Sequence, residues 1–532
     1  MIVGTGMGGA TLGYILARAG RKVLFCEKGR SYLNDPGARC GNYAEVFKGH
    51  RGVPTPADRD AMAAAGRWWD EIHDVSQGRT RRFIPYIGSG TGGSSALYGA
   101  ALERFFPADF TPARNFPGDH GAELPEAWPV SFEELLPYYR EAEALYRVQG
   151  GPDPLKTGGE AGQYRAEGEA LEPPNRELMS FFAAKGLNPY RLPVGCEQIS
   201  GCSGCQGYLC GNSCKNDSAR ICLATAISEY GATLWDNCDI VGLDADHSRV
   251  QRARAVHNGQ PVSIEAETFV LAAGALATPH LLLRSKSDWW PEGLANGSGL
   301  VGRMMMRHFV DLYAVFTKDA GLGKGAKQVA LNDLYLSSAG KFGTVQSFGA
   351  LPPPAVLVDS VRDDVEHALF KAAGLAIEAA RPLMEPFLRT LFGRATMLAS
   401  ITEDLPYRDN RVFVGEGGEV CIDYRVRPYE RKRIAAVRAE VAAILKPYRM
   451  LLIKQAENNQ RIAHVCGTCR AGDDPASSVL NRNNRAHQVD NLYVADASFF
   501  PSSGGTNPAL TIAASALRMA DQMIGINREQ IA

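Results

Sequence analysis

The sequence predicts an α/β protein in which a parallel-sheet lobe carries an inserted second lobe of sheet and helices, the latter of α+β type. Three observations support this prediction. A strand, a glycine-rich turn, a helix and a second strand follow one another within residues 1–27, a buried strand runs into a glycine near residue 274, and a strand–loop–helix unit covers residues 492–524. Alternating strands and helices build parallel sheets with right-handed crossovers. The length of 532 residues favours more than one lobe.

The first element is a Rossmann-like unit built on the motif Gly4-x-Gly6-x-x-Gly9. The first two glycines permit a tight turn and close approach of a pyrophosphate, and the third lets the helix pack on the strand. Glu27 ends the second strand and would accept hydrogen bonds from an adenosine ribose. The motif predicts a dinucleotide site without separating NAD from FAD, and a structural glycine turn is the alternative. Only three residues precede Gly4, so we expect the first strand to be clipped or to start upstream.

The following elements are read from periodicity and from Gly and Pro positions. We expect a short helix near 61–72, a Gly/Ser-rich loop at 88–95, a proline-rich surface segment at 105–129, helices at 132–145 and 365–392, a buried strand at 268–272, and the closing strand and helix at 492–495 and 508–524. The nucleotide-binding domain is predicted to comprise residues 1–127, 196–300 and 456–532. The substrate-binding domain is predicted to comprise residues 128–195 and 301–455.

Composition excludes several classes of protein. The chain carries 57 Lys+Arg and 58 Asp+Glu, a net charge of −1, which argues against nucleic-acid binding through a dominant basic surface. No apolar run reaches the roughly 18 residues of a membrane span, so no transmembrane segment is predicted. No basic leader followed by an apolar core opens the sequence, and we expect a cytoplasmic protein.

Four segments, in chain order, resemble the glucose–methanol–choline (GMC) family of flavin oxidoreductases. They are the N-terminal glycine motif, Gly90-x-Gly92-Gly93-Ser94-Ser95 with Tyr98-Gly99, the segment Gly274–Leu282, and a C-terminal block running from His464-x-x-Gly467 to Asn507-Pro508. The resemblance implies FAD as cofactor, bound by the nucleotide-binding domain. It implies FAD contacts from Gly4, Gly6, Gly9, Glu27, Thr91, Gly93, Ser94, Ser95, Tyr98, Gly99, Ile240, Ala273, Gly274, Asp496, Ala497, Asn507 and Pro508.

The resemblance also implies that His464 is the catalytic base and Asn507 the second active-site residue. Removal of hydride from an alcohol requires a group that accepts the hydroxyl proton, and histidine, with an ordinary pKa of about 6.5, suits that task. Asn507 can hydrogen-bond the alcohol oxygen and orient its carbon toward flavin N5. Pro508 suits the first position of a helix whose positive end would face the flavin. A buried structural histidine and a helix N-cap are the alternatives for the two residues, and His280, His308 and His487 are predicted to be structural.

Six of the twelve cysteines fall between residues 196 and 222. Cys202, Cys205, Cys210 and Cys214 could ligate an iron–sulfur cluster, because thiolates favour such sites. Zinc and reduced structural thiols are the alternatives. Cys196 and Cys222 could pair with each other or lie in the core.

The leading functional hypothesis is FAD-dependent oxidation of an alcohol to a carbonyl, with hydride transfer to flavin N5. A sugar dehydrogenase that relays electrons through a cluster in the cysteine loop is the runner-up, and a redox-neutral flavin lyase or a non-catalytic flavin-binding subunit are alternatives from other classes. Dehydrogenase is favoured over oxidase because the cysteine loop permits onward electron transfer to an acceptor protein or a quinone. Residues 301–455 are expected to form the substrate pocket, and their apolar side chains point to a hydrophobic alcohol rather than a simple hexose.

Overall fold

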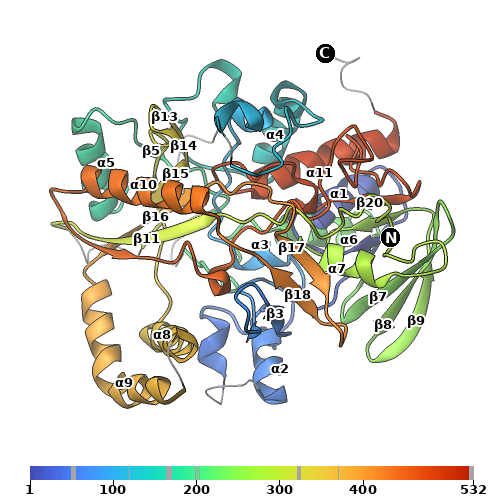
Figure 1. Ribbon diagram of the computed structural model, residues 1–532, viewed down its shortest axis with the longest axis horizontal. Helices are drawn as coiled ribbons and strands as arrows, with labels where there is room; N and C mark the ends of the chain where they lie inside the picture. The colour runs from blue at the N-terminus through green and yellow to red at the C-terminus, as the bar shows by residue number, and fades with distance from the viewer. Residues whose placement is uncertain are drawn as a thin grey trace.

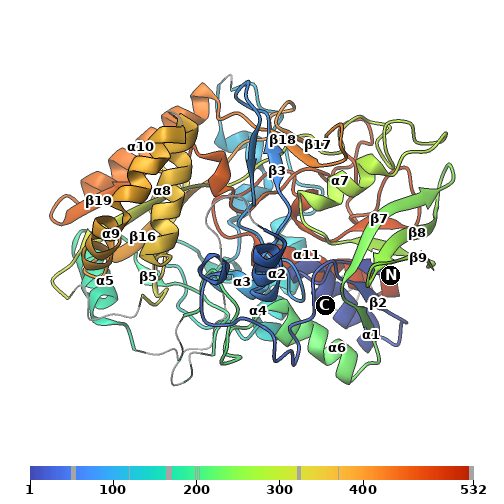
Figure 2. The ribbon, with the colours of Figure 1, turned by 90° about the horizontal axis from the view of Figure 1, so that it is seen from below.

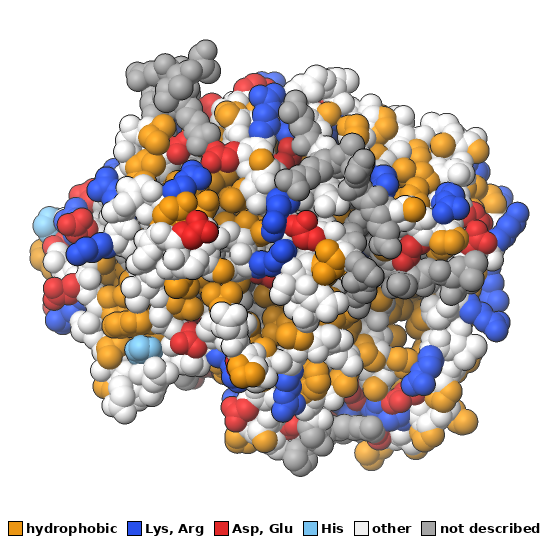
Figure 3. All heavy atoms as spheres, turned by 180° about the vertical axis from the view of Figure 1, so that it is seen from behind, with side chains coloured by type: hydrophobic (Ala, Val, Ile, Leu, Met, Phe, Trp, Pro, Cys, Tyr) orange, Lys and Arg blue, Asp and Glu red, His pale blue; other side chains and the backbone are white. Residues whose placement is uncertain are grey.

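The computed structural model describes residues 1–526 apart from 49–54, 119, 163, 165–169, 198, 200, 201, 203, 320–324, 369 and 370. Two lobes lie side by side in Figure 1, one around helices α1 and α11 and the other around helices α5 and α10. On the face that Figure 3 shows, basic and acidic side chains are intermixed. No helix among the described residues has the length and apolar character needed to cross a membrane.

The first lobe is built on a parallel sheet with strand order β20-β10-β1-β2-β6. Each neighbouring pair runs parallel, for example with Val3 opposite both Leu271 and Cys26. The strands come from both ends and the middle of the chain: β1 Ile2–Val3, β2 Leu24–Cys26, β6 Thr233–Trp235, β10 Phe269–Leu271 and β20 Leu492–Val494. This sheet confirms the predicted α/β class.

Helices α1 (Met7–Arg18), α4 (Phe132–Leu145) and α11 (Ala509–Ile524) pack together in this lobe. The predicted substrate-binding domain begins at residue 128, but α4 packs on α11 and its apolar side chains belong to the same core as the parallel sheet. Buried Arg104 also binds Glu143 of α4 through two hydrogen bonds of 2.6 Å. The structure therefore groups α4 with the first lobe.

The second lobe contains an antiparallel sheet with strand order β19-β11-β16-β15-β12-β5. Its strands are β5 Tyr190–Arg191, β11 Phe309–Phe316, β12 Val329–Leu331, β15 Gly343–Ser347, β16 Thr396–Thr402 and β19 Arg449–Ile453. Side chains of α5 (Pro173–Ala184) and α10 (Pro428–Ile444) pack with one face of this sheet in a separate core. Figure 2 shows α5 and α10 on the side of the molecule away from α1.

Smaller elements complete the described chain. Two further sheets have the orders β17-β18-β3-β4 and β7-β8-β9, and β13 pairs with β14 in a hairpin. Their strands are β3 Ile72–Asp74, β4 Arg81–Phe83, β7 Cys238–Ala245, β8 Val250–His257, β9 Gln260–Glu265, β13 Leu336–Ser337, β14 Gly340–Lys341, β17 Arg411–Val414 and β18 Val420–Asp423. The remaining α-helices are α2 Pro56–Ala64, α3 Ser94–Leu97, α6 Ala224–Ser228, α7 Ala277–Arg284, α8 Pro354–Ala368 and α9 Lys371–Phe392.

One helix lies earlier in the chain than expected. The sequence predicts a short helix near 61–72, whereas α2 starts after Thr55 and ends at Ala64. Thr55 and Asp58 form a reciprocal capping box that stabilises the early start. Gly66 lies just beyond the helix with a φ of +82° that favours glycine.

Candidate active site

Two glycine-rich loops meet at the start of α1. Gly92 donates its backbone N–H to Thr5 Oγ1 over 3.2 Å. A Cβ built on Gly93 would lie 3.2 Å from the Cα of Gly6, so only a residue without a side chain fits comfortably there. The structure thus brings together the two predicted phosphate-binding loops, which lie more than eighty residues apart in sequence.

Glu27 is buried at the end of β2 and already has four donors. One oxygen accepts the backbone N–H and the hydroxyl of Thr5, and the other accepts the N–H groups of Gly29 and Gly90. A carboxylate offers about four acceptor positions. A ribose hydroxyl would therefore share or displace one of these donors, and the ribose contact of Glu27 stays a prediction.

The N-terminus of α1 suits an anionic group. Gly6 caps the helix without a side-chain cap, and the first turn holds no acidic residue. A Cβ built on Gly6 meets no atom within 4 Å, whereas one on Gly8 would lie 1.6 Å from the carbonyl oxygen of Ala495. Open space beside unshielded helix N–H groups fits a pyrophosphate. A cavity of about 640 Å³ also opens beside the ends of β2 and β6, lined in part by Arg30 and Asp236.

The other predicted nucleotide contacts occupy positions around this turn. Asp496 is buried and its Oδ2 accepts from Gly274 N over 2.8 Å and from the Thr278 hydroxyl. A Cβ on Gly4 would lie 3.3 Å from Ala273, so that segment lines the same turn. Ala497 follows β20, and Ile240 lies buried in β7.

The second glycine-rich loop is held by hydrogen bonds of its own side chains. Thr91 Oγ1 accepts from the backbone N–H of Tyr32, and Ser94 Oγ accepts from that of Gly88. The Ser95 hydroxyl donates to the carbonyl oxygen of Gly92.

Tyr98 and Gly99 lie on the side of the loop that faces the second lobe. The Tyr98 hydroxyl donates to the Asn216 carbonyl over 2.6 Å, and burial raises the pKa of this phenol well above its ordinary value. A Cβ on Gly99 would lie 2.7 Å from Nζ of Lys327. Burial lowers the pKa of Lys327 to about 8. The segment after Tyr98 thus packs against a cationic side chain that sequence analysis does not single out.

His464 contacts a second histidine. His464 Nδ1 lies 2.9 Å from Nδ1 of His308, and the two rings meet edge to face. Nε2 of His308 lies 2.9 Å from the carbonyl oxygen of Gly504. His308 is predicted to be structural, but here it joins the segment of His464 to the loop that leads to Asn507.

This chain of contacts determines the tautomer of His464. A carbonyl oxygen only accepts, so the Nε2 of His308 carries a hydrogen and donates it to Gly504. In a neutral imidazole the other nitrogen is then an acceptor, and the Nδ1 of His308 accepts from Nδ1–H of His464. The Nε2 of His464 is consequently left with its lone pair free to take a proton.

Both rings are held neutral. Burial lowers the pKa of His308 to about 4. Burial, followed by the neighbouring His308 and Lys327, lowers the pKa of His464 well below its ordinary value. His464 also has a φ of +56°, an uncommon conformation for a residue with a side chain, and such conformations cluster at functional sites. The geometry suits a proton acceptor.

Asn507 is buried next to the end of the second-lobe sheet. Its Oδ1 accepts a hydrogen bond of 2.9 Å from Nε2 of Gln346 in β15. Pro508 is the N-cap of α11 rather than its first residue, a difference of one position at a helix end. The amide of Asn507 is therefore held by a side chain from the other lobe.

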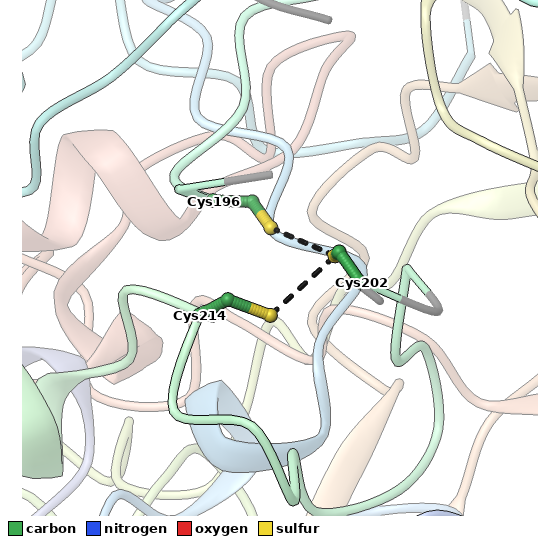
Figure 4. Close-up of side chains that lie close together, drawn as sticks. All are labelled: Cys196, Cys202 and Cys214. Carbon is green, nitrogen blue, oxygen red and sulfur yellow. Dashed lines mark hydrogen bonds between the residues drawn. The ribbon is translucent and has the colours of Figure 1, made fainter. Parts of the chain in front are cut away.

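Five sulfur atoms gather in the cysteine loop. Cys202 lies 3.7 Å from Cys196 and 3.4 Å from Cys214 between sulfur atoms, as Figure 4 shows. Cys210 lies 3.5 Å from Cys214 and interacts with Cys205. Two thiolates on one tetrahedral zinc are about 3.8 Å apart, given Zn–S bonds of about 2.3 Å. The four predicted ligands therefore gather, and Cys196 joins them.

Other cysteines of this region lie apart. Every cysteine has a free thiol, so Cys196 and Cys222 are not paired, and Cys222 is buried beside Tyr146 and Thr11. Hydrogen bonding from Cys196 lowers the pKa of Cys202, and hydrogen bonding from Cys205 lowers the pKa of Cys210. Low thiol pKa values favour metal binding and redox chemistry alike.

Family models identify the chain. The N-terminal model of GMC oxidoreductase matches residues 1–310, and the C-terminal model matches residues 419–516. The chain belongs to the GMC oxidoreductase family. Family membership confirms the resemblance and implies FAD as the cofactor of this GMC oxidoreductase.

Relatives of this GMC oxidoreductase oxidise several compounds. The 6'''-hydroxyparomomycin C oxidase of Streptomyces lividus is 29% identical, covering 97% of this chain and 89% of that protein. The paromamine 6'-oxidase of Streptomyces fradiae is 28% identical, covering 99% of this chain and 91% of that protein. The fructose dehydrogenase large subunit of Gluconobacter japonicus is 25% identical, covering 98% and 97%. The solved structure of pyridoxine 4-oxidase from Mesorbium loti has the same fold, with a TM-score of 0.64, 20% identity and 99% of each chain covered.

Sequence analysis gives no site role to three residues near His464 and Asn507, because it predicts His308 to be structural and does not single out Gln346 or Lys327. His308 follows a run of methionines and a basic residue, Gln346 lies in a five-residue strand, and Lys327 precedes another short strand. His308 bonds His464 and Gln346 bonds Asn507, and in each pair the two residues lie more than 150 residues apart in sequence. No local spacing could have revealed those contacts.

A first prediction separates phosphate binding from packing. Gly6→Ala places a methyl group in open space, so we expect an unchanged melting temperature of the FAD-free protein and at least a tenfold loss of FAD affinity. Gly8→Ala, the matched variant two residues on, clashes with Ala495 and should lower the melting temperature itself. Absorbance at flavin wavelengths and thermal unfolding measure the two effects, and unchanged FAD affinity in Gly6→Ala would contradict the assignment.

A second prediction concerns His308 and pH. Because burial lowers its pKa from 6.5 to about 4, the unfolded chain binds an extra proton between those values and stability falls as pH falls through that window. His308→Gln should reduce the slope of unfolding free energy against pH there by up to about 1.4 kcal/mol per pH unit. Urea unfolding between pH 4 and 6.5 measures the slope. Exposed His247→Gln is the control, and equal slopes for wild type and His308→Gln would refute the prediction.

Proposed function

We propose that this GMC oxidoreductase oxidises an alcohol to a carbonyl with His464 as the base. When bound, FAD would supply the hydride acceptor at N5, held by the loops around Gly6 and Gly93. The observation that carries the proposal is the hydrogen-bonded chain from Gly504 through His308 to His464. That chain supports a neutral His464 whose Nε2 is available to the substrate.

The protein side chains divide the proton chemistry between them. His464 Nε2 takes the hydroxyl proton, so that the carbinol carbon can release hydride. The positive charge that then forms on His464 is shared with His308 through the Nδ1 hydrogen bond. Asn507 faces the same alcohol oxygen and orients it. Asn507 is buried and His464 is half-buried, so their electrostatic interactions are screened less than they would be at the surface.

The substrate we propose is a hydroxylated compound of the sugar type. The names of the relatives include paromamine 6'-oxidase and the fructose dehydrogenase large subunit. These names favour sugar-like alcohols over the hydrophobic alcohol that the apolar residues of 301–455 suggest. Oxidase and dehydrogenase names both occur among these relatives. We retain the dehydrogenase proposal because a cluster held by the gathered thiols would offer a route for electrons to an acceptor protein or quinone.

A third prediction tests the base. His464→Ala should slow anaerobic bleaching of the flavin by about 10²–10⁴-fold, the range expected for a general base, while FAD stays bound. Stopped-flow absorbance after mixing with alcohols and sugars measures the rate. His487→Ala, a histidine of the same block that bonds Ser478 and Gly472, is the control and should leave the rate within twofold.

Full bleaching rates in His464→Ala would contradict the role of His464 as base. If no alcohol bleaches the wild type, a redox-neutral lyase or a non-catalytic subunit is favoured.

The second candidate function is electron relay through a cluster in the cysteine loop. The convergence of Cys196, Cys202, Cys205, Cys210 and Cys214 favours a metal site there. Buried Lys215 would offset part of the negative charge of bound thiolates, since it follows Cys214 directly and donates to the carbonyls of Ala96 and Tyr208.

A fourth prediction tests the relay. If it operates, anaerobically purified protein should contain several iron atoms and acid-labile sulfides per chain, and Cys202→Ser should remove them while FAD content stays unchanged. Elemental analysis and the visible spectrum after FAD removal measure this. Cys222→Ser, a buried cysteine of the same region that lies beside Tyr146 and Thr11 rather than among the gathered thiols, is the matched control. Zinc without sulfide, or no metal at all, would contradict the relay and leave a zinc site or structural thiols.

A further inference from the structure

Gln346 lies between the two lobes and bonds the second predicted active-site residue. Its Nε2 donates to Asn507 Oδ1 over 2.9 Å, and the side chain is 2% exposed. Its own Oε1 is buried and has no hydrogen-bond partner within the described part of the chain. A buried carbonyl oxygen without a partner costs about 1–3 kcal/mol, so such atoms call for a ligand.

The two residues that flank Gln346 on its face of the sheet are small and buried. In the sheet register Gln346 lies opposite Ala330 of β12 and Ala399 of β16, which share its face of the sheet. Both neighbours have only a methyl side chain. This face is the one opposite to α5 and α10, because the alternate residues Val345 and Leu398 belong to the core that those helices share.

The loop that carries Asn507 is held rigidly against β15. Thr344 N donates to the Gly505 carbonyl over 2.9 Å, and Gly505 N donates to the hydroxyl of buried Tyr335 over 2.8 Å. A Cβ on Gly343 would lie 2.6 Å from the Gly505 carbonyl, so the close approach of strand and loop depends on that glycine. The relative position of Gln346 and Asn507 is therefore fixed by backbone contacts.

We propose that Gln346 is a positioning residue that turns the NH₂ of Asn507 toward the substrate, and that its free carbonyl binds a second donor group of that substrate. This inference rests on the proposed function. With its Oδ1 occupied by Gln346, Asn507 offers hydrogen atoms to the alcohol oxygen. That polarity is the useful one, because negative charge develops on this oxygen as His464 removes the proton.

The second half of the proposal specifies the substrate class. An acceptor oxygen buried beside Asn507 selects compounds with a hydroxyl or amino group close to the reacting carbinol. Vicinal diols, sugars and amino alcohols have such a donor, and a simple primary alcohol leaves the carbonyl of Gln346 unpaired. Sites that hydrogen-bond a substrate group discriminate strongly against analogues that lack it.

Two variants of similar size separate the two roles. Gln346→Met removes both the N–H donor and the acceptor. Gln346→Glu introduces a carboxylate, which accepts hydrogen bonds but no longer donates one to Asn507. The amide of Asn507 should then reverse, so that its NH₂ donates to the carboxylate. Ser347→Ala, at the next position of β15 and on its opposite face, removes a buried hydroxyl that accepts from Val329 N, and it is the control for disturbance of the strand.

The experiment is anaerobic flavin bleaching of holoenzyme by 1-propanol, 1,2-propanediol, 2-amino-1-propanol and free sugars. We expect wild type to prefer the compounds with a second donor. Both Gln346 variants should lose 10–100-fold in limiting rate with FAD content unchanged. Gln346→Glu should keep the preference for a second donor, Gln346→Met should lose it, and Ser347→Ala should stay within twofold of wild type.

The outcomes distinguish this inference from the function on which it rests. No bleaching of wild type by any compound means that the proposed function fails, and the inference with it. Normal bleaching of wild type together with wild-type rates and preference in Gln346→Met overturns the inference alone. A crystal structure of Gln346→Glu adds a readout independent of activity, since an unaltered hydrogen-bond pattern around Asn507 would also overturn it.

Discussion

The hydrogen bond between His308 and His464 is the interaction on which the rest of the site depends. The Gly504 carbonyl sets its direction, because that carbonyl only accepts a hydrogen bond. His308 therefore donates from Nε2 to Gly504 and accepts at Nδ1 from His464. Nε2 of His464 therefore carries no hydrogen and has a free lone pair. Burial keeps both rings neutral by lowering their pKa values, which supports the proposal that His464 acts as a base at neutral pH. Residues of the second lobe therefore orient both side chains. His308, just before β11, orients His464, and Gln346 orients Asn507.

The parallel sheet makes this arrangement possible because it gathers distant segments. The N-terminal turn, the loop around Gly93 and the segment after β20 all pack at one edge of the sheet. Glycine is required where these backbones touch, as at Gly8 against Ala495, whereas the space beside Gly6 is open. If Gly6 binds phosphate as proposed, packing and phosphate binding depend on neighbouring positions of one short motif.

Local patterns predicted much of the first lobe. The glycine motif, the strand ending at Glu27 and the closing strand and helix follow from spacing and periodicity, because backbone geometry there is set by nearby residues. The start of α2 and the packing of α4 were predicted less well, since a capping box and a shared core decided them. The contacts of His308 and Gln346 with the two predicted active-site residues could not be predicted from the sequence, because the tertiary structure supplies them. The roles of His464, Asn507 and the flavin-contact residues stay predictions.

Nitrogen NMR of protein labelled with ¹⁵N-histidine tests the central claim most directly, because it reports which ring nitrogen carries hydrogen. The account predicts that His464 at pH 7 is neutral, with hydrogen on Nδ1 and none on Nε2, and that His308 is neutral with hydrogen on Nε2. Assignment comes from single histidine replacements. A His464 signal showing hydrogen on Nε2, or a doubly protonated ring at pH 7, would contradict the account.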